Sequence, residues 1–123
     1  MYRIQVAPIL ALVFWTLCPG FAAADGDAVN GEKLFARCSA CHSVDGSRKS
    51  APTLQGVAGR QAGAVEGARY SKALAESNIV WDDASLDAYL EAPSKLVRGT
   101  TMTIRIPKPD ERKDLIAYLK TLE

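Results

Sequence analysis

The feature that most constrains this chain is a five-residue string, Cys38-Ser39-Ala40-Cys41-His42, of the form C-x-x-C-H. On helical backbone, residues at positions i, i+3 and i+4 share one face, so the thiols and the imidazole point the same way. Two thiols at this spacing can each add to one vinyl group of a haem, and the adjacent histidine can then bind the iron. The string is therefore interpreted as a c-type haem attachment site, which predicts a fold wrapped around a large prosthetic group.

Other uses of two closely spaced cysteines have to be weighed against this interpretation. A structural zinc site needs four nitrogen or sulfur ligands. Cys18 lies in the segment interpreted below as a cleaved signal peptide, so two cysteines and a single histidine remain, which are too few without carboxylates. A thioredoxin-like dithiol belongs to a βαβ unit, and no parallel-strand pattern flanks the motif. A structural disulfide between Cys38 and Cys41 remains open, although the histidine directly after Cys41 favours haem.

The first 24 residues have the layout of a secretory signal peptide. One basic residue, Arg3, precedes an apolar run from Ile9 to Leu17, and three alanines end the segment. We expect cleavage after Ala24, which exports residues 25–123 to the periplasm as a single haem domain. The run is short for the ~30 Å core of a membrane, which disfavours an uncleaved anchor. Leu17 is a poor neighbour for a lipidated Cys18, which disfavours a lipoprotein signal.

Charge excludes one class of partner and favours another. The chain has 15 basic and 14 acidic residues, and cleavage removes one basic residue, so the domain is neutral overall. A neutral domain argues against nucleic-acid binding. The charges are uneven, with four bases against one acid in residues 33–49 and six against two in residues 92–113. Residues 66–91 hold two bases against six acids. Basic segments around the motif and Met102 predict attraction to an acidic partner protein, with Lys95 and Arg98 more important than Lys120.

A second iron ligand follows by elimination. Haem iron in electron carriers takes a proximal histidine and a second histidine or a methionine. His42 is the only histidine, and Met1 leaves with the signal peptide, so Met102 is the one thioether available. The glycine and threonines around Met102 are typical of a loop. We therefore interpret Met102 as a ligand rather than as a gap-filling core residue.

The rest of the pattern predicts an all-α domain of three or four short helices, with loops wrapped around the cofactor. A first helix is expected over residues 27–37 and a short helical piece over residues 71–75. Between them, residues 43–67 are rich in glycine and lack periodicity, which predicts an irregular loop. Such a long loop is unusual unless something large organises it.

Two further helices are expected in the second half. Asp82 or Asp83 should cap a helix that ends before Pro93, with Leu86, Tyr89 and Leu90 facing inward. Pro109 suits the first position of a final helix, whose buried stripe is expected to be Leu115, Ile116, Leu119 and Leu122.

With these residues in place, the chain resembles the class I cytochromes c of the mitochondrial and bacterial c2 type over nearly all of residues 27–122. The resemblance rests on an ordered series of motifs, which is far more specific than C-x-x-C-H alone. Besides the haem motif the series contains Gly31, Phe35, Pro52-Thr53-Leu54-x-Gly56, Gly59-Arg60, Tyr70, Ile79-Val80-Trp81, Tyr89-Leu90-x-x-Pro93, Gly99-Thr100-x-Met102 and Asp114-Leu115-Ile116-Ala117-Tyr118-Leu119.

This resemblance implies one covalent haem c, with thioether bonds at Cys38 and Cys41 and with His42 and Met102 as axial ligands. The Pro52 carbonyl would hold the other nitrogen of His42 and fix its ring. Other side chains would surround the cofactor: Tyr89 near the sulfur of Met102, and Arg60, Tyr70, Trp81 and Thr100 around the propionates. The first helix would pack through Gly31 and Phe35 against Leu115 and Tyr118. The chain departs from the family at Ser94 and Thr101, which replace lysines common around the haem edge, and at Leu74 and Ile104.

The implied function is that of a soluble, exported, monomeric electron carrier rather than an enzyme, because iron ligated on both faces has no open position for a substrate. Its partners would be redox proteins, such as membrane respiratory or photosynthetic complexes or a periplasmic dehydrogenase. One alternative is a haem subunit docked permanently to a dehydrogenase or oxidase. Another is a haem peroxidase or gas sensor, in which Met102 is absent from the iron or easily displaced.

Overall fold

A computed structural model describes residues 25–123, so the expected signal peptide lies outside the described residues. The described chain is helical, with six elements in the order α1 (Ala28–Leu34), η1 (Phe35–Arg37), α2 (Lys72–Ala75), α3 (Asp83–Glu91), α4 (Pro93–Leu96) and α5 (Pro109–Leu119). Between residues 25 and 123 the only sheet-like pairing is an isolated antiparallel bridge between Gln61 and Val80. The all-α prediction is confirmed.

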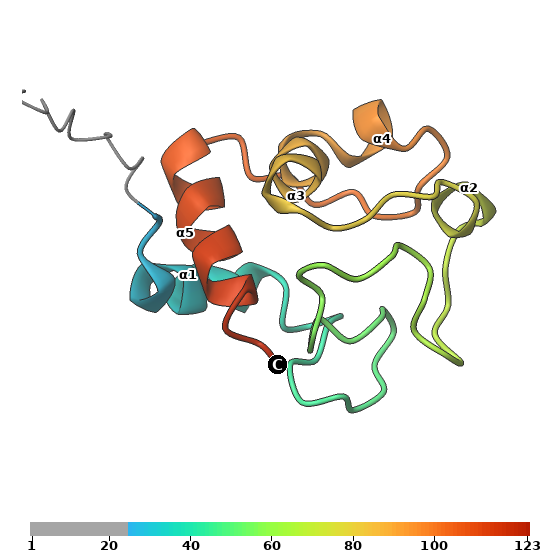
Figure 1. The fold of residues 1–123 in the computed structure, drawn as a ribbon, viewed down its shortest axis with the longest axis horizontal. Helices are drawn as coiled ribbons and strands as arrows, with labels where there is room; N and C mark the ends of the chain where they lie inside the picture. Colours follow the sequence, from blue (N-terminus) through green and yellow to red (C-terminus); the bar gives the residue numbers. More distant parts are fainter. Residues whose placement is uncertain (1–24) are drawn as a thin grey trace, which may run out of the picture.

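Helices α1 and α5 pack against each other and close one side of the molecule (Figure 1). The Asp27 side chain caps α1 by accepting hydrogen bonds from the amides of the first turn. At Gly31 a Cβ atom would overlap the Asp114 carbonyl and lie 2.8 Å from the Tyr118 Cβ, so the absence of a side chain permits the close approach. The Phe35 and Tyr118 rings lie 5.6 Å apart, which confirms the expected contact between the first and last helices.

Helix α3 begins with a capping box, in which the Ser85 amide donates to the Asp82 carboxylate and the Asp82 amide donates to the Ser85 hydroxyl. Of the two expected caps, Asp82 is therefore the one used. Leu86, Tyr89 and Leu90 are buried as predicted. The helix ends before Pro93 as predicted, at Glu91, and Pro93 is the first residue of a further short helix, α4, which was not predicted.

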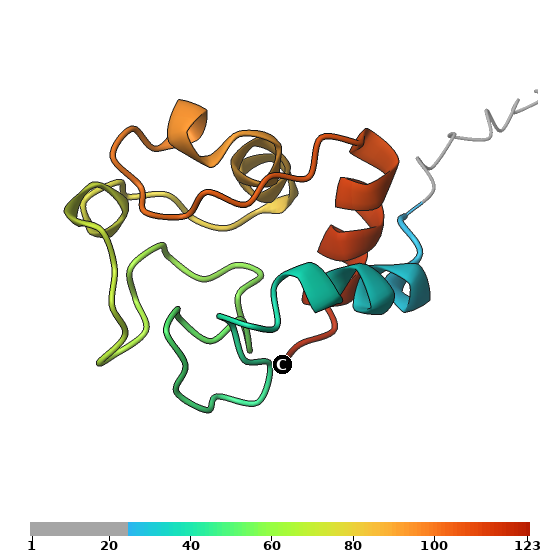
Figure 2. The same ribbon diagram turned by 180° about the vertical axis from the view of Figure 1, so that it is seen from behind.

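Residues 43–71 run from the haem motif to α2 without a helix, as the glycine-rich pattern predicted. In Figures 1 and 2 this segment forms one part of the molecule and residues 72–108 form another, with α1 and α5 joining them at one side. Gly63 has a φ of 79°, and a Cβ there would lie 2.9 Å from the Ala75 Cα. The loop can therefore approach α2 closely only with glycine at this position.

The core lies where α3, α5 and the loops meet. Ile106 and Leu115 are each 1% exposed, and Ile116 and Leu119 are also buried. Leu122 is half-buried and packs against this cluster, so the predicted stripe of α5 does face inward. No helix among residues 25–123 is long and apolar enough to cross a membrane.

Candidate functional site

One large cavity, of about 630 Å³, opens between the two loop-bearing parts of the molecule. This volume suits an organic cofactor. All ten residues singled out from the sequence line it: Cys38, Cys41, His42, Pro52, Arg60, Tyr70, Trp81, Tyr89, Thr100 and Met102. The apolar part of the wall comes from residues the sequence analysis did not assign to the site, among them Leu54, Val57, Leu74, Leu90 and Leu115.

The haem motif forms a tight helical turn directly after η1. The Cys41 amide donates to the Cys38 carbonyl at 3.1 Å, and the His42 amide donates to the same carbonyl at 2.9 Å. This backbone places the two thiols and the imidazole on one face, against the cavity. Cys38 is half-buried and Cys41 exposed, and neither forms a disulfide in the described part of the chain. Burial raises the pKa of the Cys38 thiol, and Arg37 partly opposes this.

His42 is held by the loop that follows the motif. Its Nδ1 lies 2.6 Å from the Pro52 carbonyl oxygen. A carbonyl can only accept a hydrogen bond, so Nδ1 carries the proton and Nε2 has a free lone pair. Burial lowers the pKa of His42, although the bond to Pro52 partly opposes the shift. Together these effects favour a neutral, oriented imidazole, the form that binds a metal.

Met102 lines the same cavity from the segment between α4 and α5, where it is half-buried. Its amide donates a long hydrogen bond, 3.4 Å, to the Thr100 hydroxyl, which lies 2.6 Å from the Tyr89 hydroxyl. Burial raises the pKa of Tyr89, and the Thr100 bond partly offsets this. Thr100 was expected beside the propionates; the structure pairs it with Tyr89, whose ring also packs 5.0 Å from that of Trp81.

The charged side chains that line the cavity are all cationic. Arg37, Arg60 and Arg69 line it, and no aspartate or glutamate among the described residues does. The Arg60 guanidinium donates to the Gln55 carbonyl at 2.7 Å and to the Thr53 carbonyl at 2.8 Å. Its Nε is buried without a hydrogen-bond partner in the described residues, and burial lowers the pKa of Arg60. A bound acceptor would satisfy this buried donor, and an anionic group suits a guanidinium best.

These features fit a haem. The cavity offers a thiol pair, a neutral imidazole, a thioether, an apolar wall and an arginine whose donor can bind a propionate.

Arg37 and Arg69 were not singled out by the sequence analysis, although each directly precedes a predicted site residue. Tyr70 was singled out, and its hydroxyl accepts a hydrogen bond from the Val65 amide at 3.1 Å. Within residues 25–123 no cluster of three or more histidine, cysteine or acidic residues could hold a metal ion.

The fold and the site define a haem protein of the helical cytochrome c class, and comparisons with known proteins agree. The family model for cytochrome c matches residues 28–123. Cytochrome c2 of Rhodomicrobium vannielii is 39% identical over 98% of this chain and 97% of its own. Cytochrome c of Gibberella zeae is 46% identical over 79% of this chain and 95% of its own. Among solved structures, cytochrome cH from Methylobacterium extorquens is 46% identical with a TM-score of 0.75, covering 78% of this chain and 99% of that one.

The chain therefore belongs to the cytochrome c family. It carries one covalently attached haem c, and it is an electron-transfer protein rather than an enzyme.

Proposed function

We propose that the mature protein is an exported carrier that moves one electron at a time between redox proteins through a haem ligated by His42 and Met102. Thioether bonds from Cys38 and Cys41 would attach the cofactor. The observation that carries this proposal is the cavity itself, because the only histidine of the chain and the only methionine of the described residues line the same cavity.

The bound iron supplies a centre that gains and loses one electron reversibly. Around it, the Pro52 carbonyl orients the His42 ring and keeps its proton on Nδ1. The Arg60 Nε is available to a propionate. The hydrogen bond between Tyr89 and Thr100 ties the non-helical segment that carries Met102, residues 97–108, to α3. The apolar wall excludes water, which limits the reorganisation that accompanies each change of charge.

We further propose that residues 1–24 are a signal peptide and that the domain works in the periplasm. The match of the cytochrome c family model supports this, because it begins at residue 28 and leaves residues 1–24 outside the domain. The partners would be membrane respiratory or photosynthetic complexes or a periplasmic dehydrogenase, with no role in nucleic-acid binding. The neutral but unevenly charged domain supports short-lived contacts between monomeric proteins.

Optical spectra of the exported protein in both redox states test the proposal. We expect a low-spin haem in each state, retained after denaturing extraction, and no reaction of the ferrous protein with carbon monoxide. Rapid carbon monoxide binding would instead support a peroxidase or gas sensor. A native mass well above that of the single 25–123 domain would support a permanently docked subunit.

A further inference from the structure

Arg112 is a buried cationic residue that does not line the haem cavity. Arg112 is only 5% exposed, and it lies near the start of α5, on the side facing α3. Ionised side chains are rarely buried this fully unless several partners satisfy them. In the sequence Arg112 is simply one of six bases around Met102, so its burial is a finding of the structure.

The Arg112 guanidinium joins three elements. Its Nε donates to the Asp87 carboxylate on α3 at 2.7 Å. Its Nη1 donates to two consecutive main-chain carbonyls, of Ile106 at 3.0 Å and Pro107 at 2.9 Å. These carbonyls lie at the end of the segment that carries Met102, just before α5 begins. A planar guanidinium with five fixed donors can satisfy all three acceptors at once.

The Met102 segment, residues 97–108, has no helix of its own and is held to α3 both before and after Met102, with the Arg105 Nε donating to the Glu91 carbonyl at 3.1 Å. Before Met102, the Thr100 hydroxyl bonds to Tyr89. After it, the Ile106 amide donates to the Leu90 carbonyl at 2.8 Å, and the Ile106 side chain is 1% exposed. Thr101, Thr103, Ile104 and Arg105, the residues around Met102 between these anchors, are exposed. The position of the Met102 sulfur therefore depends on how firmly both ends are held.

We propose that Arg112 is a positioning residue for the sixth ligand: it fixes the carboxyl-terminal end of the Met102 segment to α3 and α5 and so keeps the thioether on the iron. This inference rests on the proposed ligation by Met102. Without Arg112 the Ile106 and Pro107 carbonyls lose their donor, and the state in which the segment swings away from the iron becomes easier to reach.

The test measures how readily an external ligand replaces Met102. In the ferric holoprotein, imidazole binds only when the segment opens, so its apparent Kd reports the population of the open state. We expect Arg112→Met to lower that Kd about tenfold, since hydrogen bonds to a charged group are among the stronger ones in proteins. Hydrogen exchange at the Ile106 amide should accelerate by a similar factor.

A matched control is available in Lys120, which pairs with Asp83 at 3.1 Å and joins the same two helices without touching the Met102 segment. Lys120→Met should leave the imidazole Kd within about twofold of the wild-type value, as expected for an exposed pair. Arg112→Lys keeps the charge but not the planar fork, so its Kd should fall about threefold, between wild type and Arg112→Met.

The proposal is overturned if Arg112→Met lowers global stability in denaturant while its imidazole Kd equals that of the wild type. Should that variant fail to retain haem, a wild-type Kd for Arg112→Lys overturns it equally. Failure of the underlying ligation would look different: Met102→Ala would then leave the ferric spectrum unchanged, whatever Arg112 does.

Discussion

His42 presents a defined nitrogen to the cavity because its other nitrogen donates to the Pro52 carbonyl. The orientation of the ring thus comes from a main-chain atom ten residues further on. Met102 differs, since its thioether carries no hydrogen-bond donor and its position depends on the segment around it. The two proposed ligands are therefore held in physically different ways, and we expect the methionine side to be the weaker one.

Replacing Met102 tests this directly. Met102→Ala should convert the ferric iron from low-spin to high-spin or water-ligated. It should also lower the reduction potential by on the order of 0.1 V, because axial ligands set haem potentials over a range of about 0.8 V. Optical spectroscopy and a redox titration measure both effects. An unchanged spectrum would mean that a different group, such as a lysine, occupies the sixth position.

The two cysteines can be tested as a pair. Without haem, the apolar side chains of the cavity of about 630 Å³, among them Leu54, Leu90 and Leu115, would lose their packing partner and face water. A typical domain has only about 5–15 kcal/mol of stability in total. Cys38→Ser with Cys41→Ser should therefore lose haem on denaturing extraction and refold poorly without it. Far-ultraviolet circular dichroism measures this, and native helix content in a haem-free double variant would contradict the expectation.

At the scale of the elements, carboxylates of α5 hold α1 and η1 in place. Asp114 accepts from the Asn30 side chain and from the Asp27 amide, each at 2.7 Å. Glu111 accepts from Arg37 at 2.7 Å, just before the haem motif. The hydrogen bond from Asn30, helped by that from Asp27, lowers the pKa of Asp114, and the bond from Arg37 lowers that of Glu111. Both carboxylates thus stabilise the fold only when ionised.

This contact should be sensitive to acid. A carboxylate whose pKa is lower in the folded state stabilises above its unfolded pKa and loses that contribution as pH falls through the folded value. For Asp114 the ordinary value is 3.8. Asp114→Asn should therefore have a lower denaturant midpoint than wild type at pH 7, and the difference should shrink as pH drops below this value. Glu76→Gln, which breaks only an exposed pair with Lys72 at 3.9 Å, should match wild type throughout.

The elements were predictable where local chemistry decides them. Asp82 as a cap, Pro109 at the start of α5 and the inward faces of α3 and α5 all follow from capping and periodicity. Helix α4 was missed because a proline that prevents one helix from continuing is also well suited to begin the next. The expected single helix over residues 27–37 is divided, with η1 tightening the chain before the motif.

The site residues likewise fall into those that could be predicted from the sequence and those that could not. Residues with distinctive chemistry could be found in the sequence, and the ten chosen ones line one cavity. Arg37 and Arg69 could not be identified from the sequence, because the path of the irregular loops decides which arginines reach the cavity. Arg112 could not either, since its burial depends on Asp87 and on two main-chain carbonyls brought together only by the fold.

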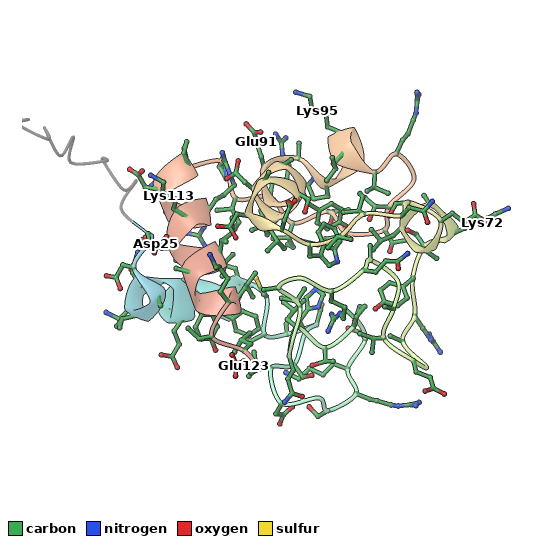
Figure 3. The ribbon with its side chains drawn as sticks, viewed as in Figure 1. Asp25, Lys72, Glu91, Lys95, Lys113 and Glu123 are labelled. Carbon is green, nitrogen blue, oxygen red and sulfur yellow. The ribbon has the colours of Figure 1, made fainter. Side chains whose placement is uncertain are left out.

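At the scale of the whole molecule, the structure changes which charges are available to a partner. Arg112 is buried against Asp87, and Arg37 and Lys108 share Glu111. Arg69 and Arg98 are exposed, and neither forms an ion pair within residues 25–123. Arg69 lines the cavity, and Arg98 lies just before the Thr100–Met102 part of its wall. Lys95 points outward from α4 at the top of the view, whereas Lys113 lies on α5 at the left (Figure 3).

The exposed residues of the cavity wall mark where a partner would approach the haem. They include Arg69, Thr101, Thr103 and Ile104, the last 48% exposed. Of these four residues only Arg69 is charged and only Ile104 is apolar, so this edge is weakly basic. A sparse basic edge on a neutral domain should attract an acidic partner modestly and form a small, short-lived interface.

Electron exchange with an acidic redox protein should therefore slow as ionic strength rises. Screening shortens the reach of each charge from about 10 Å at 0.1 M salt to about 3 Å at 1 M. Because the charges are sparse, we expect the exchange rate to fall by only several-fold. Stopped-flow rates measure this. Arg98→Glu and Arg69→Glu should each reduce the low-salt rate more than Lys120→Glu, which changes the charge equally at a residue outside the cavity wall. A rate indifferent to salt, with all three variants alike, would rule out electrostatic steering and leave the apolar surface around Ile104 as the basis of docking.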